Sequence, residues 1–216
     1  MGTNCNLPHL EYEKSYGFPG KVIAGIDEVG RGCIAGPVVA AVACLPPKID
    51  FNQNPWLREV RDSKLLTPLK REMLSLHLTQ WLSGFAIGLA TVNEIDDINI
   101  LQASFLAMER ALEILSKKIS IDQVLVDGKF VPLHLKGFFF PIIKGDQKCL
   151  SIACASIIAK VYRDHLMEQL DAQYPHYGLS KHKGYPTQMH KEALKTHGVS
   201  ILHRKSFEPV RVLLSV

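Results

Sequence analysis

The segment 22–32, VIAGIDEVGRG, indicates the fold more directly than any other part of the chain. Residues 22–29 are rich in Val and Ile, which favours a β-strand, and the glycines that follow break that strand. A second apolar run, 38–45, begins after Gly36-Pro37 and ends before Pro46-Pro47. Two strand-like runs joined by a short glycine-rich connection predict an antiparallel pair.

Further strands and helices alternate along the rest of the chain. Apolar periodicity and capping residues predict helices over 67–82, 101–118, 150–170 and 187–197, and β-like runs predict strands over 85–92, 124–126 and 138–143. This order predicts an α/β fold, in which a mixed sheet is flanked by helices. Residues from about 174 to 216 predict a small helical C-terminal subregion on that core.

The composition is that of an ordinary globular protein. The chain has 216 residues, 47% of them hydrophobic and 21% charged, which excludes a disordered or fibrous protein and predicts one domain. We expect this domain to span 21–216 and residues 1–20 to form an N-terminal extension. The net charge of +4 is compatible with a polyanionic partner without requiring one.

The cysteines and the apolar runs bear on where the protein works. Five cysteines (Cys5, Cys33, Cys44, Cys149 and Cys154) contain no CxxC pair, which favours a reducing compartment over a disulfide framework or thiolate zinc site. The longest apolar run, 33–45, is shorter than the ~20 residues of a membrane helix. Residues 1–20 lack the apolar core of a secretory signal. We therefore expect a cytoplasmic protein without a membrane partner.

Four carboxylates stand at or near the ends of apolar, strand-like runs: Asp27, Glu28, Asp127 and Asp146. Each Asp on its own is also typical of a turn. If the strand ends meet at one edge of the sheet, crowded carboxylates repel each other unless a cation lies between them, and Mg²⁺ prefers oxygen ligands of this kind. The pattern therefore predicts a metal site used for phosphoryl chemistry. Strand alternation places Asp27 and Glu28 on opposite faces, so sharing one site requires a local twist or a substitute ligand.

Several other residues have the chemistry to bind a phosphate, sugar or base. In Gly30-Arg31-Gly32 the glycines allow a close backbone approach and Arg31 offers a bidentate fork, although a tight hairpin or a dinucleotide-binding turn remain alternatives. Ser63-Lys64 offers a hydroxyl and an ammonium, and is otherwise a solvated loop. Tyr185 lies between basic residues and is suited to stacking on a sugar or base, or is a plain surface aromatic.

Two other kinds of site receive little support. His176, His182 and His190 lack the spacing of a zinc-binding motif. Ser151 and Ser156 lie in an apolar helical stretch without the order of a Ser-His-Asp triad.

Taken together, the ordered motifs resemble bacterial ribonuclease HII, the type 2 ribonuclease H family. The resemblance runs from about residue 20 to the C-terminus, and the turn is Gly-Arg-Gly where type 3 enzymes usually carry Gly-Thr-Gly. Cys33 and Cys154 depart from the usual family residues. The motifs that carry the resemblance are IAGIDEVGRG (23–32), AGPVVAA (35–41), DSKL (62–65), VDG (126–128), KGD (144–146), SIACASIIAKVYRD (151–164), HKGYPT (182–187) and HRKSF (203–207).

The resemblance implies an RNase H-like fold and a metal-dependent endoribonuclease. Its substrates would be RNA–DNA hybrids and DNA duplexes that contain single ribonucleotides, cut on the ribonucleotide's 5′ side to leave 5′-phosphate and 3′-hydroxyl ends. The implied ligands of two Mg²⁺ or Mn²⁺ ions are Asp27, Glu28, Asp127 and Asp146. Asp164 is a fifth candidate, or only part of an ion pair. We expect a monomer.

The resemblance also implies how the substrate is held. Gly30, Arg31 and Gly32 would read the ribose 2′-OH, the group that distinguishes RNA from DNA. Tyr185 would stack on the sugar at the RNA–DNA junction. Backbone phosphates would be neutralised by Ser63, Lys64 and Arg163, so that affinity falls with salt.

Two other functions are compatible with the same residues. A different metal-dependent phosphoryl enzyme, such as a DEDD-type exonuclease, would share the carboxylates but digest from strand ends. A hybrid-binding protein without catalysis would need a broken acidic set, whereas here the set is whole.

Overall fold

The computed structural model describes residues 7–215. The first six residues of the predicted N-terminal extension, which include Cys5, and Val216 lie outside the described part. The division into an extension (1–20) and one domain (21–216) stays a prediction. Within the described part, helix α1 (Glu11–Ser15) packs on the core, and the fully buried Glu13 carboxylate accepts hydrogen bonds from the N–H and the hydroxyl of Ser151 at 2.8 and 2.7 Å.

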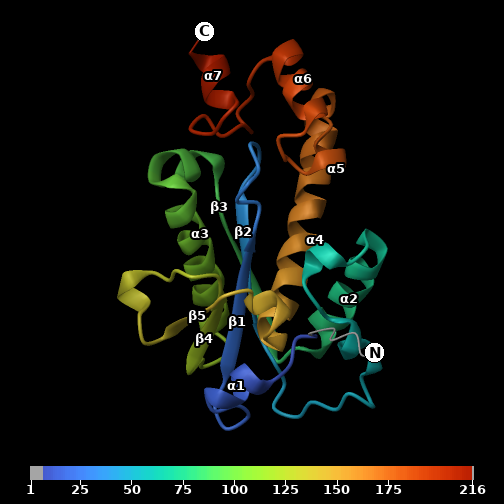
Figure 1. The fold of residues 1–216 in the computed structure, drawn as a ribbon, viewed down its shortest axis with the longest axis vertical. Helices are drawn as coiled ribbons and strands as arrows, with labels where there is room; N and C mark the ends of the chain where they lie inside the picture. The colour runs from blue at the N-terminus through green and yellow to red at the C-terminus, as the bar shows by residue number, and fades with distance from the viewer. Residues whose placement is uncertain (1–6, 216) are drawn as a thin grey trace, which may run out of the picture.

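The centre of the molecule is a five-stranded mixed sheet in the order β3-β2-β1-β4-β5 (Figure 1). Strand β1 pairs antiparallel with β2 and β2 with β3, whereas β4 pairs parallel with both β1 and β5. The predicted antiparallel pair and the predicted mixed α/β sheet are both confirmed. The strands are β1 (Ile23–Val29), β2 (Val38–Cys44), β3 (Gly84–Ala90), β4 (Gln123–Asp127) and β5 (Phe139–Ile142).

Helix α3 (Val92–Ser116) covers one face of the sheet, where it packs on the alternate residues Ala24, Ile26 and Val126. It begins nine residues before the predicted start at 101. Its first turn is set by a capping box, in which Thr91 and Glu94 each accept a hydrogen bond from the other's backbone N–H. The amphipathic period begins only after a kink at Asn99 (φ 67°), which is why the sequence pattern missed the first segment.

Helices α2 (Pro68–Trp81) and α4 (Leu150–Gln173) cover the opposite face (Figure 1). Gly25 allows the backbone of α4 to approach β1 very closely, because a Cβ at this position would lie 2.2 Å from the carbonyl carbon of Ser151. The first half of α4 therefore lies directly on β1. This approach fixes which side chains of α4 reach the end of that strand.

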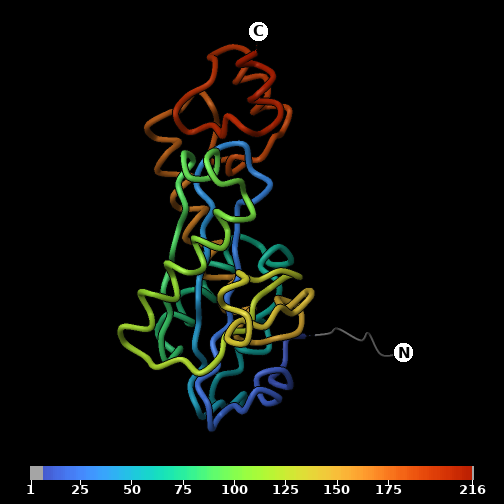
Figure 2. The backbone as a smooth tube through the Cα atoms, turned by 90° about the vertical axis from the view of Figure 1, so that its left-hand side faces the viewer, coloured from blue at the N-terminus to red at the C-terminus, as the bar shows by residue number. Residues whose placement is uncertain are grey.

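The C-terminal subregion contains α5 (Leu179–His182), α6 (Gln188–His197) and α7 (Val210–Leu214). It lies beyond the sheet, at the far end of α4 and of the molecule's long axis (Figures 1 and 2). A buried cluster joins it to the 30–37 loop: Ile34, Ala35, Met167, Tyr177, Leu179, Leu194 and Val210. This helical subregion agrees with the sequence prediction.

Short 3₁₀ helices complete the described structure. They are Pro55–Glu59, Ser63–Leu65, Leu133–Leu135, Gly145–Gln147 and Pro175–Tyr177. None of the helices in residues 7–215 is both long and apolar enough to span a bilayer.

Candidate active site

Three of the predicted carboxylates meet where β1 and β4 end. The register pairs Ile26 with Val126, so the next residues, Asp27 and Asp127, are neighbours on the face that α4 covers. Asp146 lies in the 3₁₀ helix that follows β5, and Asp127 Oδ1 accepts a hydrogen bond from Gly145 N–H at 2.7 Å. The topology of the parallel strands therefore brings these three side chains together, as predicted.

Glu28 approaches the same strand ends from the other face of the sheet. Together with Arg31 and Asp127 it lines a small pocket beside α3. Arg31 Nη1 donates to Glu28 Oε1 at 3.2 Å. The expected alternation of Asp27 and Glu28 thus holds, and Asp127, the last residue of β4, adjoins both.

Three of these carboxyl groups have raised pKa values, because they are buried close together with little positive charge beside them. Burial, and then repulsion from Glu28 and Asp127, raises the pKa of Asp27 well above its usual 3.8. Burial, and then the neighbouring Asp127, raises the pKa of Asp146 to about 6. Burial also raises the pKa of Glu28, against the attraction of Arg31.

Lys64 is the exposed cation that faces the acidic cluster. Partial desolvation lowers its pKa, but attraction by carboxylates, with Asp62 the strongest, outweighs this and raises the pKa overall. Asp62 itself is a buried fifth carboxylate that contributes to the raised pKa of Asp146, after burial and Asp127, and it accepts from Gln147 Nε2 at 3.3 Å. No role was predicted for Asp62, although its place in the DSKL motif directly before Ser63-Lys64 was a signal that could have identified it.

The donor set fits a hard divalent cation. Among residues 7–215, no three His, Cys, Asp or Glu side chains already form a closed metal-binding cluster. The groups at the strand ends are nevertheless all carboxylates, and burial followed by repulsion from neighbouring carboxylates raises the pKa values of Asp27 and Asp146. An ion bound by carboxylate oxygens would remove this repulsion, which is the situation that Mg²⁺ or Mn²⁺ sites resolve.

The glycine turn and Tyr185 lie beside one another. Gly30 (φ +97°) leaves no room for a side chain, because a Cβ would lie 2.2 Å from Arg163 Nε. A Cβ on Gly32 would lie 3.8 Å from Tyr185 Cε1, so the ring of Tyr185 faces this glycine. The side chains of Arg31 and Tyr185 are 49% and 38% exposed, which leaves both accessible to a substrate.

Two predicted phosphate ligands are buried rather than exposed. Arg163 has no exposed surface and donates to the carbonyls of Ala35, Pro37 and Lys183 at 3.1, 3.0 and 2.8 Å. Ser63 is 3% exposed, and its hydroxyl hydrogen-bonds to that of Ser156 at 3.0 Å. Both side chains are therefore engaged in hydrogen bonds inside the protein, and neither is exposed to a phosphate.

Arg204 is a second buried arginine that contacts the 30–37 loop, and no role was predicted for it. Its guanidinium donates to Gly36 O at 3.0 and 2.8 Å and to Arg31 O at 3.1 Å. Burial lowers its pKa to about 10. Arg163 and Arg204 together hold the 30–37 loop by its carbonyl oxygens. Nothing in the sequence indicates this, because buried arginines cannot be distinguished from exposed ones by local pattern.

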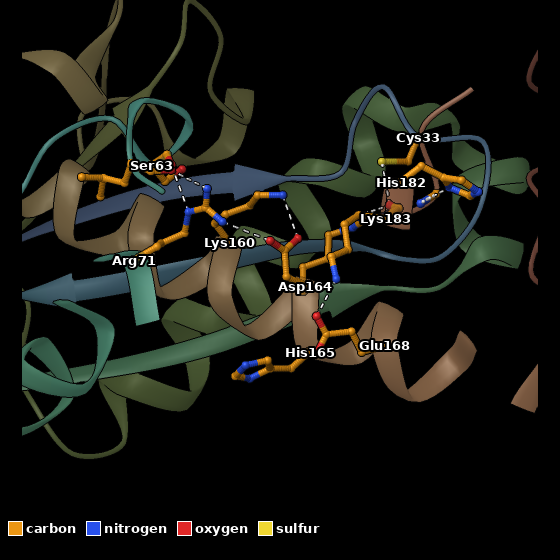
Figure 3. A network of polar contacts seen from close by, with 12 residues as sticks. Cys33, Ser63, Arg71, Lys160, Asp164, His165, Glu168, His182 and Lys183 are labelled. Atoms are coloured by element: carbon orange, nitrogen blue, oxygen red, sulfur yellow. Dashed lines mark hydrogen bonds and ion pairs between the residues drawn. The ribbon is translucent and has the colours of Figure 1, made fainter. Parts of the chain in front are cut away.

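Asp164 does not join the acidic cluster as a free carboxylate. It lies between Arg71 and Lys160, with N–O distances of 3.2 and 2.7 Å (Figure 3). The ion-pair alternative is therefore correct, although the partners differ from the adjacent Arg163. Ser151, which with Ser156 was considered for a triad, donates a hydrogen bond from its hydroxyl to the Glu13 carboxylate.

Comparison with known proteins shows what the chain resembles as a whole. The family model described as Ribonuclease HII matches residues 24–210. Ribonuclease HII of Dehalococcoides mccartyi strain 195 is 46% identical over 197 residues, which cover 90% of this chain and 89% of that protein. Ribonuclease H2 from Pyrococcus horikoshii OT3 superimposes with a TM-score of 0.70 and 30% identity, covering 90% of this chain and 97% of that one.

A more distant structure shares the fold. Bst-RNase HIII, solved in complex with Mn²⁺, gives a TM-score of 0.70 at 20% identity and covers 93% of this chain and 71% of that one. These likenesses confirm the expected RNase H-like arrangement of a mixed sheet flanked by helices.

Proposed function

The chain belongs to the ribonuclease HII family, and from this premise we propose that it also cuts duplex DNA at single embedded ribonucleotides. Family membership makes it a ribonuclease H, a nuclease that hydrolyses the RNA strand of RNA–DNA hybrids. The finer proposal is an endonucleolytic cut on the 5′ side of the ribonucleotide, which leaves 5′-phosphate and 3′-hydroxyl ends. Its cellular use would be the removal of ribonucleotides from DNA.

The acidic cluster supports this proposal most directly. Asp27, Glu28, Asp127 and Asp146 would hold two divalent cations, Mg²⁺ or Mn²⁺. The chemistry that such a pair supplies when bound is activation of the attacking water and stabilisation of the leaving 3′ oxygen. Asp127 is already oriented by the Gly145 N–H, so this carboxylate does not need to be ordered when substrate arrives.

The cations and the glycine turn would hold the substrate. Lys64 is exposed beside the carboxylates, and its ammonium is suited to a backbone phosphate close to the cleaved bond. Among the three phosphate ligands implied by the resemblance, we propose direct contact only for Lys64. Ser63 and Arg163 are buried, and we assign them supporting positions.

Recognition of the ribonucleotide would take place at the turn. Gly30, Arg31 and Gly32 would approach the ribose 2′-OH, since glycines expose backbone groups to a ligand. Tyr185 faces Gly32 with 38% of its surface exposed, which suits stacking on the sugar of the next nucleotide. The enzyme would then detect both a ribonucleotide and the DNA that follows it.

Turnover on a uniform hybrid separates a metal-dependent endoribonuclease from the two alternative functions, and a DNA duplex with one ribonucleotide then tests the finer proposal. The assay uses an internally labelled RNA strand annealed to DNA, with Mg²⁺, with Mn²⁺ and with EDTA, and compares the wild type with Asp27→Asn. We expect metal-dependent internal products from the wild type alone. Single-nucleotide products released from the ends would support an exonuclease, and binding without turnover would support a hybrid-binding protein.

A further inference from the structure

Three histidines of the C-terminal subregion pack together beneath Tyr185, and the proposed catalytic chemistry uses none of them. His182, His190 and His203 are 8%, 0% and 0% exposed. The rings of His182 and His190 stack with centroids 4.2 Å apart, and His190 Nε2 lies 3.1 Å from His203 Nε2. Two ring nitrogens at this separation form a hydrogen bond only if one of them carries a proton and the other does not.

The backbone decides which nitrogen carries that proton. Ser200 N–H donates to His203 Nδ1 at 3.1 Å, so in the neutral ring the proton of His203 is on Nε2. His203 Nε2–H therefore donates to His190 Nε2. The proton of His190 is then on Nδ1, which lies 3.0 Å from the carbonyl oxygen of Tyr185 and donates to it.

The third histidine is fixed by the same logic. Gly184 N–H donates to His182 Nδ1 at 3.2 Å, and His182 Nε2 lies 2.9 Å from the carbonyl oxygen of Tyr177, to which it donates. Every ring nitrogen of the three histidines thus has a hydrogen-bond partner. These partners leave no ring lone pair of the three histidines free for a zinc ion.

We propose that His190 and His203 are positioning residues: a one-directional relay from Ser200 N–H through both rings fixes the Tyr185 carbonyl. This inference rests on the proposed function, because the contact of Tyr185 with substrate is itself proposed. The Tyr185 carbonyl also accepts from Thr187 N–H at 2.8 Å, and Tyr185 N–H donates to His182 O at 2.9 Å. The relay adds a side-chain hydrogen bond that fixes the direction in which the Tyr185 carbonyl points.

The position of Tyr185 relative to the turn depends on the peptides on both sides of this residue. Gly184 O accepts from Ile34 N–H at 2.9 Å, which joins the tyrosine segment to the 30–37 loop. The ring of Tyr185 then faces Gly32. A small rotation of the 185–186 peptide, which carries the Tyr185 carbonyl, would move the ring away from the ribonucleotide site, and misplacements of this kind are costly in rate.

The relay works only with neutral rings. A proton added at His190 Nε2 would face the His203 Nε2–H at 3.1 Å, and a proton added at His203 Nδ1 would face the Ser200 N–H, also at 3.1 Å. Burial lowers the pKa of both imidazoles to about 4, so both are neutral near pH 7.

A direct test needs no variant. Nitrogen-15 NMR of the histidine side chains of the full chain at pH 7.5 reports which ring nitrogen carries the proton. We expect the Nδ1–H tautomer at His190 and the Nε2–H tautomer at His203. The same tautomer at both residues, or the reverse assignment, would overturn the relay.

The functional test uses two substitutions of His190. An Asn amide can occupy the place of Nδ1 and donate to Tyr185 O, whereas a Gln amide reaches only toward Nε2. The readout is the ratio of cleavage rates on a single-ribonucleotide duplex and on a uniform hybrid. We expect His190→Gln to lower this ratio about fivefold, the equivalent of one hydrogen bond, and His190→Asn to restore most of it.

The control is His197→Asn, which removes an exposed imidazole from the same helix α6 and should leave the ratio unchanged. Thermal midpoints of all variants show whether each one is folded. Equal losses in the Asn and Gln variants, or equal losses on the two substrates, would overturn the positioning role. A wild type inactive on both substrates would overturn the proposed function, whereas the NMR result decides the relay separately.

Discussion

Asp146→Asn should stabilise the metal-free protein while removing its activity. The Asp146 carboxyl is 6% exposed, and burial together with Asp127 and Asp62 raises its pKa from 3.8 to about 6. A carboxyl of raised pKa holds its proton longer in the folded state, so the free energy of unfolding falls as pH rises from 3.8 towards 6. At 1.36 kcal/mol for each pKa unit, the loss at neutral pH is about 3 kcal/mol.

An asparagine cannot ionise, so the variant lacks this penalty. In EDTA at pH 7.5 we expect Asp146→Asn to be more stable than the wild type by about 2–3 kcal/mol, after allowance for altered hydrogen bonds. At pH 4.5, where the folded wild-type carboxyl is mostly protonated, the difference should fall to about 1 kcal/mol. Urea unfolding of both proteins at the two pH values measures it. Cleavage of a hybrid with Mn²⁺ measures the accompanying loss of activity.

Asp164→Asn is the matched control, because its carboxylate lies between Arg71 and Lys160. Removing the negative charge there leaves two cations unpaired, so this variant should lose about 1–3 kcal/mol at pH 7.5. If Asp146→Asn were less stable than the wild type by the same amount at both pH values, repulsion could not be the cause of the raised pKa. The argument from repulsion would also be refuted if Mg²⁺ stabilised the Asp146→Asn variant as much as the wild type, since binding energy adds to folding energy.

Three further predictions concern the site and its support. Asp127→Asn should abolish cleavage and leave duplex affinity within about twofold in a gel-shift assay, because it removes a proposed metal ligand and no phosphate contact; near-normal turnover would exclude Asp127 from the site. Arg31→Ala and Tyr185→Ala should each slow cleavage at a single ribonucleotide about tenfold more than cleavage of a long hybrid, the cost of one lost stacking or charged contact; equal losses in matched rate assays would contradict junction reading. Burial lowers the pKa values of His190 and His203 from 6.5 to about 4, so between these pH values the unfolded chain binds protons that the folded chain does not. Acid should therefore lower the free energy of unfolding by about 3 kcal/mol per histidine. Urea unfolding over this pH range should show a smaller loss in His190→Asn than in the wild type, and the same dependence on pH in both would contradict neutral buried rings.

Much of the fold follows from short-range sequence rules. The run 22–29, which carries two carboxylates near its end and is followed by glycines, forms the central strand of the sheet. Thr67 and Thr187 are the N-caps of α2 and α6, which agrees with the predicted helix starts at 67 and 187. The early start of α3 was missed because residues 92–98 precede the kink at Asn99 and lie outside the helical period of the segment that follows.

The carboxylate set was visible for a different reason. Charges at the ends of apolar runs are rare enough to be noticed, and parallel neighbours such as β1 and β4 bring their ends together. Burial of Arg163, Arg204 and the histidine relay depends on the C-terminal subregion folding back on the 30–37 loop. Local patterns carry no information about such long-range packing, so these supporting residues were either misplaced or missed.

The most direct test of the account uses an end-labelled DNA duplex that contains one ribonucleotide. The protein is incubated with it in Mg²⁺ or Mn²⁺, and again in EDTA, with an all-DNA duplex as control. The account predicts one metal-dependent cut on the 5′ side of the ribonucleotide and no cut in the control. A ladder of products from the strand ends, or binding without any cut in either metal, would contradict it.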